Sequence, residues 1–262
     1  MADGTEYREI LYRLEDNVAT ITLNRPEALN GMTGVMRAEL RHALARAGKE
    51  ARAMALTGAG RGFCSGQDLG ATRSAGDIDL EQLLRDEYDP ILKLIAESPI
   101  PVLCAVNGPA AGAGANLALA CDVVIAARSA YFLEAFARIG LLPDAGGTWH
   151  LPRQVGLARA MGMSLFAEPV PALQAAEWGM IWEVVDDDAL EPRVTDLAGR
   201  LAKGPTRAYA AIRKALRSSV ENSYADQLEL EAREQGALGS SRDFEEGVLA
   251  FLEKRKPVYE GR

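Results

Sequence analysis

Hydrophobic and polar positions alternate near the start of the chain. Residues 9–14 and 18–23 place apolar side chains at roughly every second position, and a polar turn at 15–17 separates them. This pattern predicts a β-hairpin, because successive side chains of a strand point to opposite faces. Beyond the break at Arg25-Pro26, apolar residues in 33–46 recur every three or four positions, which predicts a helix with one buried face.

The middle of the chain alternates short apolar runs with helical or glycine-rich segments. Helical spacing covers 78–97, a turn-rich loop occupies 58–70, and a further helix is expected after Gly112. This alternation of strand-like and helix-like segments favours an α/β fold. Three apolar runs are expected to form buried strands, at 54–57, 102–106 and 123–126.

The last third of the chain has helical spacing almost throughout. Its final segment carries an apolar face, and such a helical tail can cover its own core or another subunit. The sequence leaves both options open. The helices are expected at 158–166, 172–178, 190–202, 206–218, 223–236 and 243–254.

Composition and charge narrow the class of protein. The chain of 262 residues is 48% hydrophobic and 25% charged, which is typical of a soluble globular protein. No apolar run approaches the roughly 20 residues that span a bilayer, and the polar, acidic N-terminus resembles neither a signal nor a transit peptide. A net charge of −8 argues against nucleic acid as a partner.

Cysteine and histidine usage limits the chemistry further. Cys64, Cys104 and Cys121 lie in apolar or glycine-rich surroundings without metal-ligand spacing, as expected of buried thiols in a reducing, cytoplasmic compartment. The two histidines, His42 and His150, leave few candidate bases for a Ser-His-Asp or Cys-His mechanism. We therefore expect neither a metal site nor a metal cofactor.

Two glycine-rich turns are the strongest candidates for a functional site. The first, G-P-A-A-G-A-G-A-N at 108–116, follows an apolar run and leads into a helix, so its backbone N–H groups are free to face an oxyanion. The second, L-P-D-A-G-G-T-W at 142–149, carries a lone carboxylate, Asp144. Together they suggest chemistry beside a carbonyl group.

Two further motifs complete a recognisable set: N-R-P-E-A-L-N at 24–30 and L-T-G-A-G-R-G-F-C-S-G-Q-D-L at 56–69. In this order the four motifs resemble the enoyl-CoA hydratase/isomerase (crotonase) superfamily, from about residue 8 to 257. The resemblance implies a β-β-α spiral core over 1–195, which would hold coenzyme A and the active site. A C-terminal helical region over 196–262 would cap the core and form trimers or dimers of trimers. The acyl-CoA ligand is the substrate, so no separate cofactor is implied.

The resemblance also assigns roles to single residues. Family members hold the thioester oxygen with two backbone N–H groups, which fall here on Gln67 and Ala113, so the side chains at these two positions are expected to vary freely. Such donors stabilise an enolate by a few kcal/mol each. Substrate-binding residues would be Gly112, Gly114, Asn116 and Phe136. Coenzyme A would contact Arg25, Ala28, Gly66, Asp68, Leu69 and Lys254.

Departures from the family pattern favour one reaction. Hydratases of this family carry glutamates where Asn116 and Phe136 stand, and two carboxylates are needed to activate water while exchanging a proton. Hydration should therefore be poor, and Glu134, offset by two residues, is expected to point elsewhere. Asp144 resembles the acid/base of the 1,2-epoxyphenylacetyl-CoA isomerases of phenylacetate degradation, which form oxepin-CoA, and these isomerases resemble Δ3,Δ2-enoyl-CoA isomerases.

Several alternatives stay open at this point. Asp144 could serve only to cap its turn, since Pro-Asp-Ala-Gly is favourable turn chemistry. The chain could instead be an enoyl-CoA hydratase, or a dehalogenase-like member in which an aspartate near Asp144 attacks an aromatic ring. A non-catalytic, RNA-binding member of the fold is a further alternative, against which the acidic charge weighs. Residues 70–88 are expected to cover the acyl group.

Overall fold

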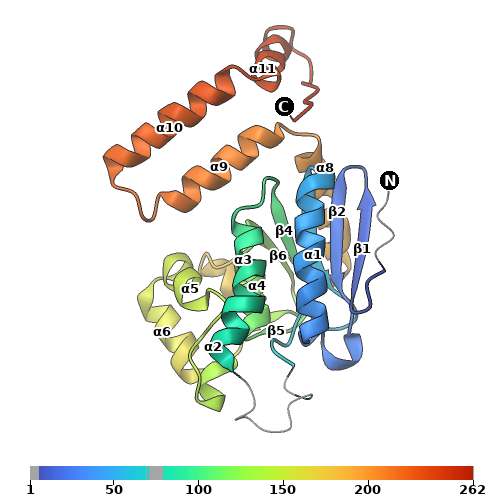
Figure 1. Cartoon of the computed structure of the whole chain (residues 1–262), viewed down its shortest axis with the longest axis vertical. Coiled ribbons are helices and arrows are strands. Elements are labelled where there is room, and N and C mark those ends of the chain that lie inside the picture. Colours follow the sequence, from blue (N-terminus) through green and yellow to red (C-terminus); the bar gives the residue numbers. More distant parts are fainter. Residues whose placement is uncertain (1–5, 69, 71–78, 262) are drawn as a thin grey trace.

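The apolar runs of the sequence form one six-stranded sheet in the computed structural model, which describes residues 6–68, 70 and 79–261. The first two strands are antiparallel and all others are parallel. Figure 1 shows the sheet at the centre of the molecule. Its strands, in spatial order, are β1 (Ile10–Glu15), β2 (Val18–Leu23), β3 (Ala53–Gly58), β4 (Val102–Val106), β6 (Val123–Ala127) and β9 (Glu183–Val185).

The predicted hairpin and the predicted buried strands are confirmed. Asp16 and Asn17 form the two-residue turn between β1 and β2, with left-handed φ values of 48° and 62°. Two-residue hairpin turns need this conformation, and Asp and Asn tolerate it. Strands β3 and β4 are almost wholly buried, which explains why their sequences are continuous apolar runs instead of alternating ones.

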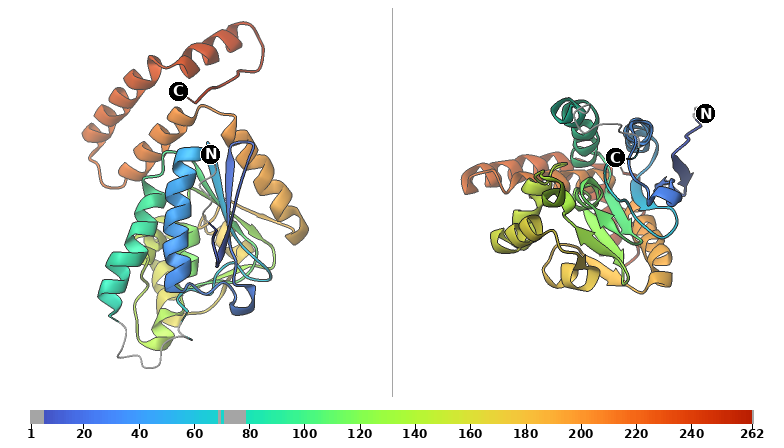
Figure 2. Two further views of the ribbon diagram at one scale, coloured as in Figure 1. Left: turned by 45° about the vertical axis from the view of Figure 1, so that its right-hand side comes forward. Right: turned by 90° about the horizontal axis from the view of Figure 1, so that it is seen from below.

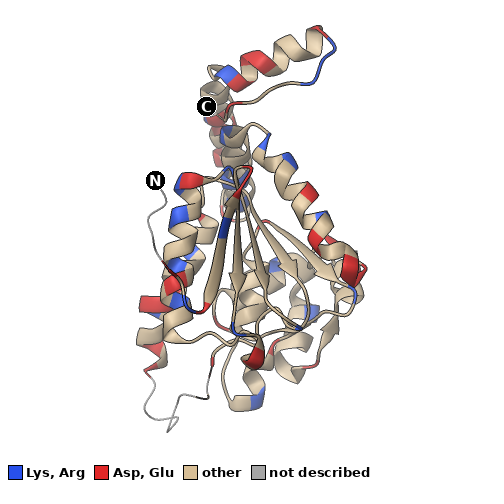
Figure 3. Ribbon diagram, turned by 90° about the vertical axis from the view of Figure 1, so that its right-hand side faces the viewer, with Lys and Arg blue, Asp and Glu red and all other residues tan. Residues whose placement is uncertain are grey.

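Helices cover both faces of the sheet. The Thr33 side chain caps α1 (Gly34–Glu50) by accepting a hydrogen bond from Met36 N at 3.1 Å, and the face predicted to be apolar is buried. Helix α8 (Leu190–Ala202) packs against β3, β4 and β6. Figure 2 shows α1 in blue and α8 in orange on opposite sides of the sheet. In Figure 3 charged residues of both signs gather on helices and loops, and the strands are largely free of them.

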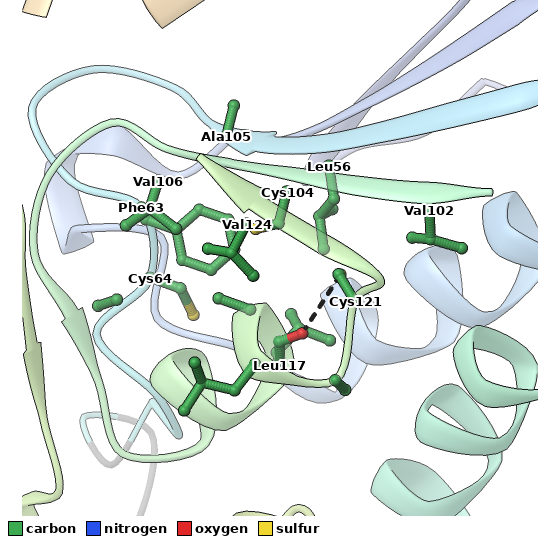
Figure 4. Close-up of a cluster of buried hydrophobic side chains, with 14 of the residues drawn as sticks. Leu56, Phe63, Cys64, Val102, Cys104, Ala105, Val106, Leu117, Cys121 and Val124 are labelled. Atoms are coloured by element: carbon green, nitrogen blue, oxygen red, sulfur yellow. Dashed lines mark hydrogen bonds between the residues drawn. The ribbon is translucent and has the colours of Figure 1, made fainter. Parts of the chain in front are cut away.

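The cysteines are buried within this core, as expected. All three are free thiols. Figure 4 shows Cys64, Cys104 and Cys121 among apolar side chains, with the Cys121 thiol donating to Leu117 O at 3.5 Å. Burial raises the pKa of Cys64 to about 12, so this thiol stays protonated at neutral pH.

A small second sheet was not predicted. It contains β5 (Ala110–Ala111), β7 (Tyr131–Leu133) and β8 (Val170–Pro171), strands too short to show an alternating pattern. Strands β5 and β7 are parallel, with Ala111 opposite Leu133. Because parallel strands end at the same edge of a sheet, the residues that follow β5 and β7 are brought together.

The predicted helix at 78–97 is interrupted, and its first residue lies outside the described residues. One π-helical turn, Leu84–Tyr88, separates α2 (Leu80–Leu83) from α3 (Asp89–Ala96). Helix α5 (Gly147–Val155), which contains Pro152, was also not predicted from the sequence. Other helices agree within a few residues with the predicted segments: α4 (Ala113–Leu119), α6 (Leu157–Phe166), α7 (Ala172–Glu177), α9 (Thr206–Ser218), α10 (Tyr224–Gly239) and α11 (Arg242–Leu252).

Helices α9, α10 and α11 extend away from the sheet (Figure 1). The boundary expected after residue 195 falls inside α8, which is a continuous helix packed on the sheet. The apolar face expected for the last helix is exposed in a single chain, with Phe251 82% and Leu252 69% accessible. The division into two regions, and the partner of that face, stay predictions. Within the described residues no helix is long and apolar enough to cross a bilayer.

A partly buried ion-pair cluster attaches α9 to the core. The Asp122 carboxylate accepts hydrogen bonds from Arg213 Nε at 2.5 Å and from Arg217 Nη2 at 2.9 Å. It also accepts from Val102 N of β4 at 2.8 Å. Arg213 is buried and also donates to Ile95 O at 2.7 Å. Asp122 is therefore the anion that makes burial of the Arg213 guanidinium tolerable.

Asp122→Ala should destabilise the fold by about 3–5 kcal/mol, because it leaves a buried guanidinium without its carboxylate. Urea denaturation followed by circular dichroism measures this change. Asp196→Ala is the control, since the Asp196 side chain on α8 is 58% exposed and its ion pairs should contribute at most about 1 kcal/mol. Equal urea midpoints for the two variants would contradict the role given to Asp122.

Candidate active site

The turn before Gln67 and the turn before α4 are in backbone contact. Ala111 N donates to Cys64 O at 2.9 Å. A Cβ atom on Gly66, whose φ is 92°, would lie 2.8 Å from Ala111 O and 3.4 Å from Ala113 N. A Cβ atom on Gly114 would overlap the carbonyl oxygen of Cys64. Both glycines are therefore required by close approach of two main-chain segments.

This contact brings together the two N–H groups that the sequence singled out. Gly66 O accepts from Met32 N at 2.8 Å, and Asp68 N donates to Met32 O at 3.1 Å. Because both neighbours of Gln67 bond to Met32, the Gln67 N–H points to the other side of its segment. Ala113 is the first residue of α4, so its N–H has no acceptor within the helix.

The Gln67 side chain is held in place by specific contacts, which the expectation that it varies freely did not include. Its Oε1 atom accepts hydrogen bonds from Arg37 Nη1 at 2.7 Å and from the Tyr88 hydroxyl at 2.6 Å. Arg37 is buried and pairs with Glu87 at 2.8 Å. Burial raises the pKa of Tyr88, so its hydroxyl stays a donor. Sequence reasoning missed both partners, because they come from α1 and from the π-helical turn.

Asn116 joins the two loops that carry acidic residues. It is fully buried in α4, and its Nδ2 donates to Asp144 O at 2.9 Å and to Glu134 Oε2 at 3.3 Å. Gly147 N also donates to Asp144 O, at 2.8 Å. A Cβ atom on Gly147 would lie 2.7 Å from Asn116 Oδ1, so glycine is needed there to admit the amide.

Glu134 lies in this cluster, and the expectation that its side chain points elsewhere is wrong. The reason is the parallel pairing of β5 with β7, which the sequence did not reveal. Glu134 directly follows β7, at the edge where the turn after β5 leads into α4. It is only 1% exposed.

Burial changes the acidity of both carboxyl groups. It raises the pKa of Asp144 to about 6. It raises the pKa of Glu134 to about 7, with the Asp144 charge adding to this shift and the Asn116 hydrogen bond opposing it. Among the described residues, Asn116 Oδ1, Glu134 Oε1 and Asp144 Oδ1 are buried without a hydrogen-bond partner. A carboxyl group that titrates near neutral pH can both take up and release a proton.

Phe136 and Gly112 contribute an apolar contact beside these groups. Gly112 has a φ of 53° and precedes α4, with its N–H donating to Leu133 O at 2.8 Å. A Cβ atom on Gly112 would lie 3.6 Å from the ring of Phe136, which is buried in the 3-10 turn Ala135–Ile139. Six of the seven residues expected to be catalytic or substrate-binding therefore belong to three contacting segments: Gln67, Gly112, Ala113, Gly114, Asn116 and Asp144. The seventh residue, Phe136, lies in the 3-10 turn Ala135–Ile139, and its ring lies beside Gly112.

Arg25 and Asp68, both expected to bind coenzyme A, are paired with each other. Arg25 Nη1 donates to Asp68 Oδ2 at 2.8 Å and to Gly31 O at 2.6 Å. The Gly70 N–H and the Arg25 guanidinium lower the pKa of Asp68. Arg25 therefore already has a carboxylate partner, so only part of its charge remains to attract a phosphate group.

The other residues expected to bind coenzyme A are not all in one place. Ala28 O accepts from the Ser65 hydroxyl at 3.2 Å, which ties its loop to the turn that contains Gly66. Leu69 lies outside the described residues. Lys254 follows α11, at the opposite end of the molecule from β5 (Figure 1). In the described part of the chain, no group of three His, Cys, Asp or Glu side chains is placed to hold a metal ion.

The family model for enoyl-CoA hydratase/isomerase matches residues 13–262. The chain belongs to the enoyl-CoA hydratase/isomerase family. A "probable enoyl-CoA hydratase" of Rhodobacter capsulatus is 58% identical over 98% of this chain and 99% of its own length. The 1,2-epoxyphenylacetyl-CoA isomerase of Escherichia coli is 48% identical over 97% of this chain and 98% of its own length.

Solved structures agree with this membership and confirm the crotonase-like fold. The enoyl-CoA hydratase from Bacillus anthracis superposes with a TM-score of 0.90 at 30% identity, covering 97% of this chain and 100% of that one. An enoyl-CoA hydratase from Mycobacterium smegmatis gives a TM-score of 0.90 at 29% identity, covering 96% and 99%. This is an enzyme family that acts on acyl-CoA thioesters.

Gly114→Ala should lower the thermal unfolding midpoint, because the added methyl group overlaps Cys64 O and overpacking costs about 1–3 kcal/mol. Gly162→Ala in α6 is the matched control. A Cβ atom there meets no atom of the described residues within 4 Å, and alanine favours a helix over glycine by up to about 1 kcal/mol. Differential scanning calorimetry compares the two. A Gly114→Ala midpoint at or above that of the unmodified protein would show that the turns can separate freely.

Proposed function

We propose that this protein is an acyl-CoA isomerase that moves a proton beside the thioester carbonyl of its substrate. The observation that carries the proposal is the place of Asp144, whose main-chain oxygen accepts from Asn116 Nδ2 of α4 at 2.9 Å, in the same cluster as the paired backbone turns. Burial raises the pKa of its carboxyl group to about 6. Asn116 and Phe136 stand where the family's hydratases carry glutamates. The site therefore offers one acid/base toward the substrate instead of the pair used for hydration.

In the proposed reaction, Gln67 N and Ala113 N donate hydrogen bonds to the thioester oxygen. Asp144 removes a proton from the carbon next to the thioester, and the negative charge moves onto that oxygen as an enolate. The two donors stabilise the enolate by a few kcal/mol each. Asp144 then returns the proton at another carbon, so the product is an isomer and no water is consumed. The pKa of Asp144 keeps it ionised at neutral pH while it remains basic enough to accept a proton.

We propose two substrates within this chemistry. The first is the ring epoxide of phenylacetyl-CoA, isomerised to oxepin-CoA in phenylacetate degradation. It is supported by 48% identity to a relative named 1,2-epoxyphenylacetyl-CoA isomerase. The second is a 3-enoyl-CoA isomerised to the 2-enoyl-CoA, which uses the same enolate. The acyl group would contact Gly112, Gly114, Asn116 and Phe136.

An enoyl-CoA hydratase is the second candidate function. It is favoured by the name of the 58% identical relative from Rhodobacter capsulatus. The near-neutral pKa of Glu134 in the same cluster also favours it, because a second carboxyl group could help to activate water. The hydrogen bond that Glu134 accepts from Asn116, and the 1% exposure of Glu134, weigh against direct contact of its carboxyl group with substrate.

The proposal also includes how coenzyme A is bound, how the subunits assemble and where the protein is located. Coenzyme A would be bound by Arg25, Ala28, Gly66, Asp68 and Leu69, and Lys254 would serve a neighbouring subunit of a homotrimer or dimer of trimers. The exposed apolar side chains of α11 support such an assembly. We propose no separate cofactor and a cytoplasmic location, which the three buried free thiols support.

Asp144→Asn should lower kcat by roughly 10²–10⁴-fold and leave KM nearly unchanged, because it removes the base and keeps its size. In the unmodified enzyme kcat should fall as the pH drops below about 6, where Asp144 becomes protonated and can no longer accept a proton. Asp188→Asn, at an exposed position, is the control. Turnover of the Asp144→Asn variant at the unmodified rate would remove Asp144 from the reaction.

The balance between isomerisation and hydration separates the two candidate functions. A 3-enoyl-CoA should be converted to the 2-enoyl-CoA at least roughly tenfold faster than crotonyl-CoA is hydrated, since one carboxylate suffices only for the first reaction. Product analysis by liquid chromatography of a panel of CoA thioesters, including the phenylacetyl-CoA ring epoxide, gives both rates. Comparable rates would favour the hydratase.

A further inference from the structure

Glu134 is a buried carboxyl group that the proposed reaction does not use. It lies between β7 and the 3-10 turn Ala135–Ile139 and is 1% exposed. Its Oε2 atom accepts from Asn116 Nδ2 at 3.3 Å, and its Oε1 atom is buried without a hydrogen-bond partner among the residues that the structure describes. A buried carboxylate usually accepts several hydrogen bonds, so this environment is poor for a negative charge.

The cluster around Asn116 has too few donors for its acceptors. Asn116 Nδ2 already donates to Glu134 and to the main-chain oxygen of Asp144. One side-chain oxygen of each of these three residues is buried and unpartnered within the described part of the chain. Two ionised carboxylates would add mutual repulsion to this shortage. One proton on Glu134 removes a charge and supplies a donor.

Cations on the neighbouring elements do not offset a second negative charge. Helices α4 and α7 carry no Lys or Arg, and strands β5 and β7 carry no charged residue. Burial lowers the pKa of His150 in α5 to about 4, so it is neutral. The arginines of the 3-10 turn, α5 and α6 are bound elsewhere in the described structure: Arg138 to Ala167 O, Arg153 to Trp149 and Arg159 to the Trp178 ring.

We propose that Glu134 is a positioning residue, held as a neutral acid against Asn116 so that Asp144 is the single negative charge of the site. Through Asn116, Glu134 also fixes the main chain of Asp144. Of the two acids, Glu134 keeps the proton because it is the more buried: Glu134 is 1% exposed, and Asp144 is only partly buried. Its ionisation would place a second charge near the developing enolate and disfavour it.

This inference rests on the proposed isomerase and predicts the shape of its pH profile. In the unmodified enzyme kcat should decline above about pH 7, approaching a tenfold loss per pH unit as Glu134 ionises. Glu134→Gln keeps the shape and the acceptor for Asn116 but cannot ionise. Its kcat should match the unmodified plateau and stay level up to pH 9, while the decline below about pH 6 caused by Asp144 persists.

Two further variants complete the test. Glu134→Met also cannot ionise but offers Asn116 no carboxamide or carboxylate oxygen, so its plateau should fall while its profile still lacks the alkaline decline. If only one of the two variants folds, its pH profile alone shows whether the decline in kcat above about pH 7 depends on Glu134. Glu168→Gln, an exposed acid after α6, should retain that decline. Thermal unfolding checks that each variant is folded.

The outcomes separate this inference from the proposed function. An alkaline decline that persists in Glu134→Gln or Glu134→Met, with Asp144→Asn inactive, would overturn the role of Glu134 and leave the isomerase standing. An active Asp144→Asn variant would overturn the proposed function itself. A level profile in both Glu134 variants, with rescue of the plateau by glutamine, supports the neutral acid.

Discussion

The backbone contact between the turn at 64–67 and the turn at 110–114 is the constraint on which the site depends. Two main-chain segments can approach this closely only where no Cβ atom intervenes, which requires glycine at 66 and 114. The parallel strands β3 and β4 deliver both segments to the same end of the sheet. The sheet thus supplies the approach, and the glycines allow the two N–H groups to lie close together.

Charge is the second constraint. The site buries two carboxyl groups beside one amide, and desolvation raises the pKa of both toward neutrality. An enzyme that forms an enolate benefits from this environment, because a near-neutral acid can serve as base and then as acid. The same burial limits the site to one full negative charge. Asn116 fits that limit because its amide brings donors without bringing charge.

The regular elements could be predicted from the sequence, and the second sheet could not. Residues 9–23 alternate apolar and polar side chains, and β3 and β4 are continuous apolar runs. Each of these local patterns is enough to predict a strand. Strands β5, β7 and β8 have two or three residues each, too few for a pattern. Their pairing decides where Glu134 lies, so a two-residue offset in the sequence gave the wrong expectation. Likewise, Arg37 and Tyr88 reach Gln67 from 30 and 21 residues away, a contact that no local pattern indicates.

Deuterium exchange at the carbon next to the thioester is the sharpest test of proton transfer by Asp144, because it measures enolate formation without requiring the natural substrate. Phenylacetyl-CoA would be incubated with the enzyme in D₂O and followed by proton NMR. The unmodified enzyme should replace the protons of this carbon with deuterium. The Asp144→Asn variant should do so at a rate lower by roughly 10²–10⁴-fold. No exchange with the unmodified enzyme, or equal rates with both, would contradict proton transfer by Asp144.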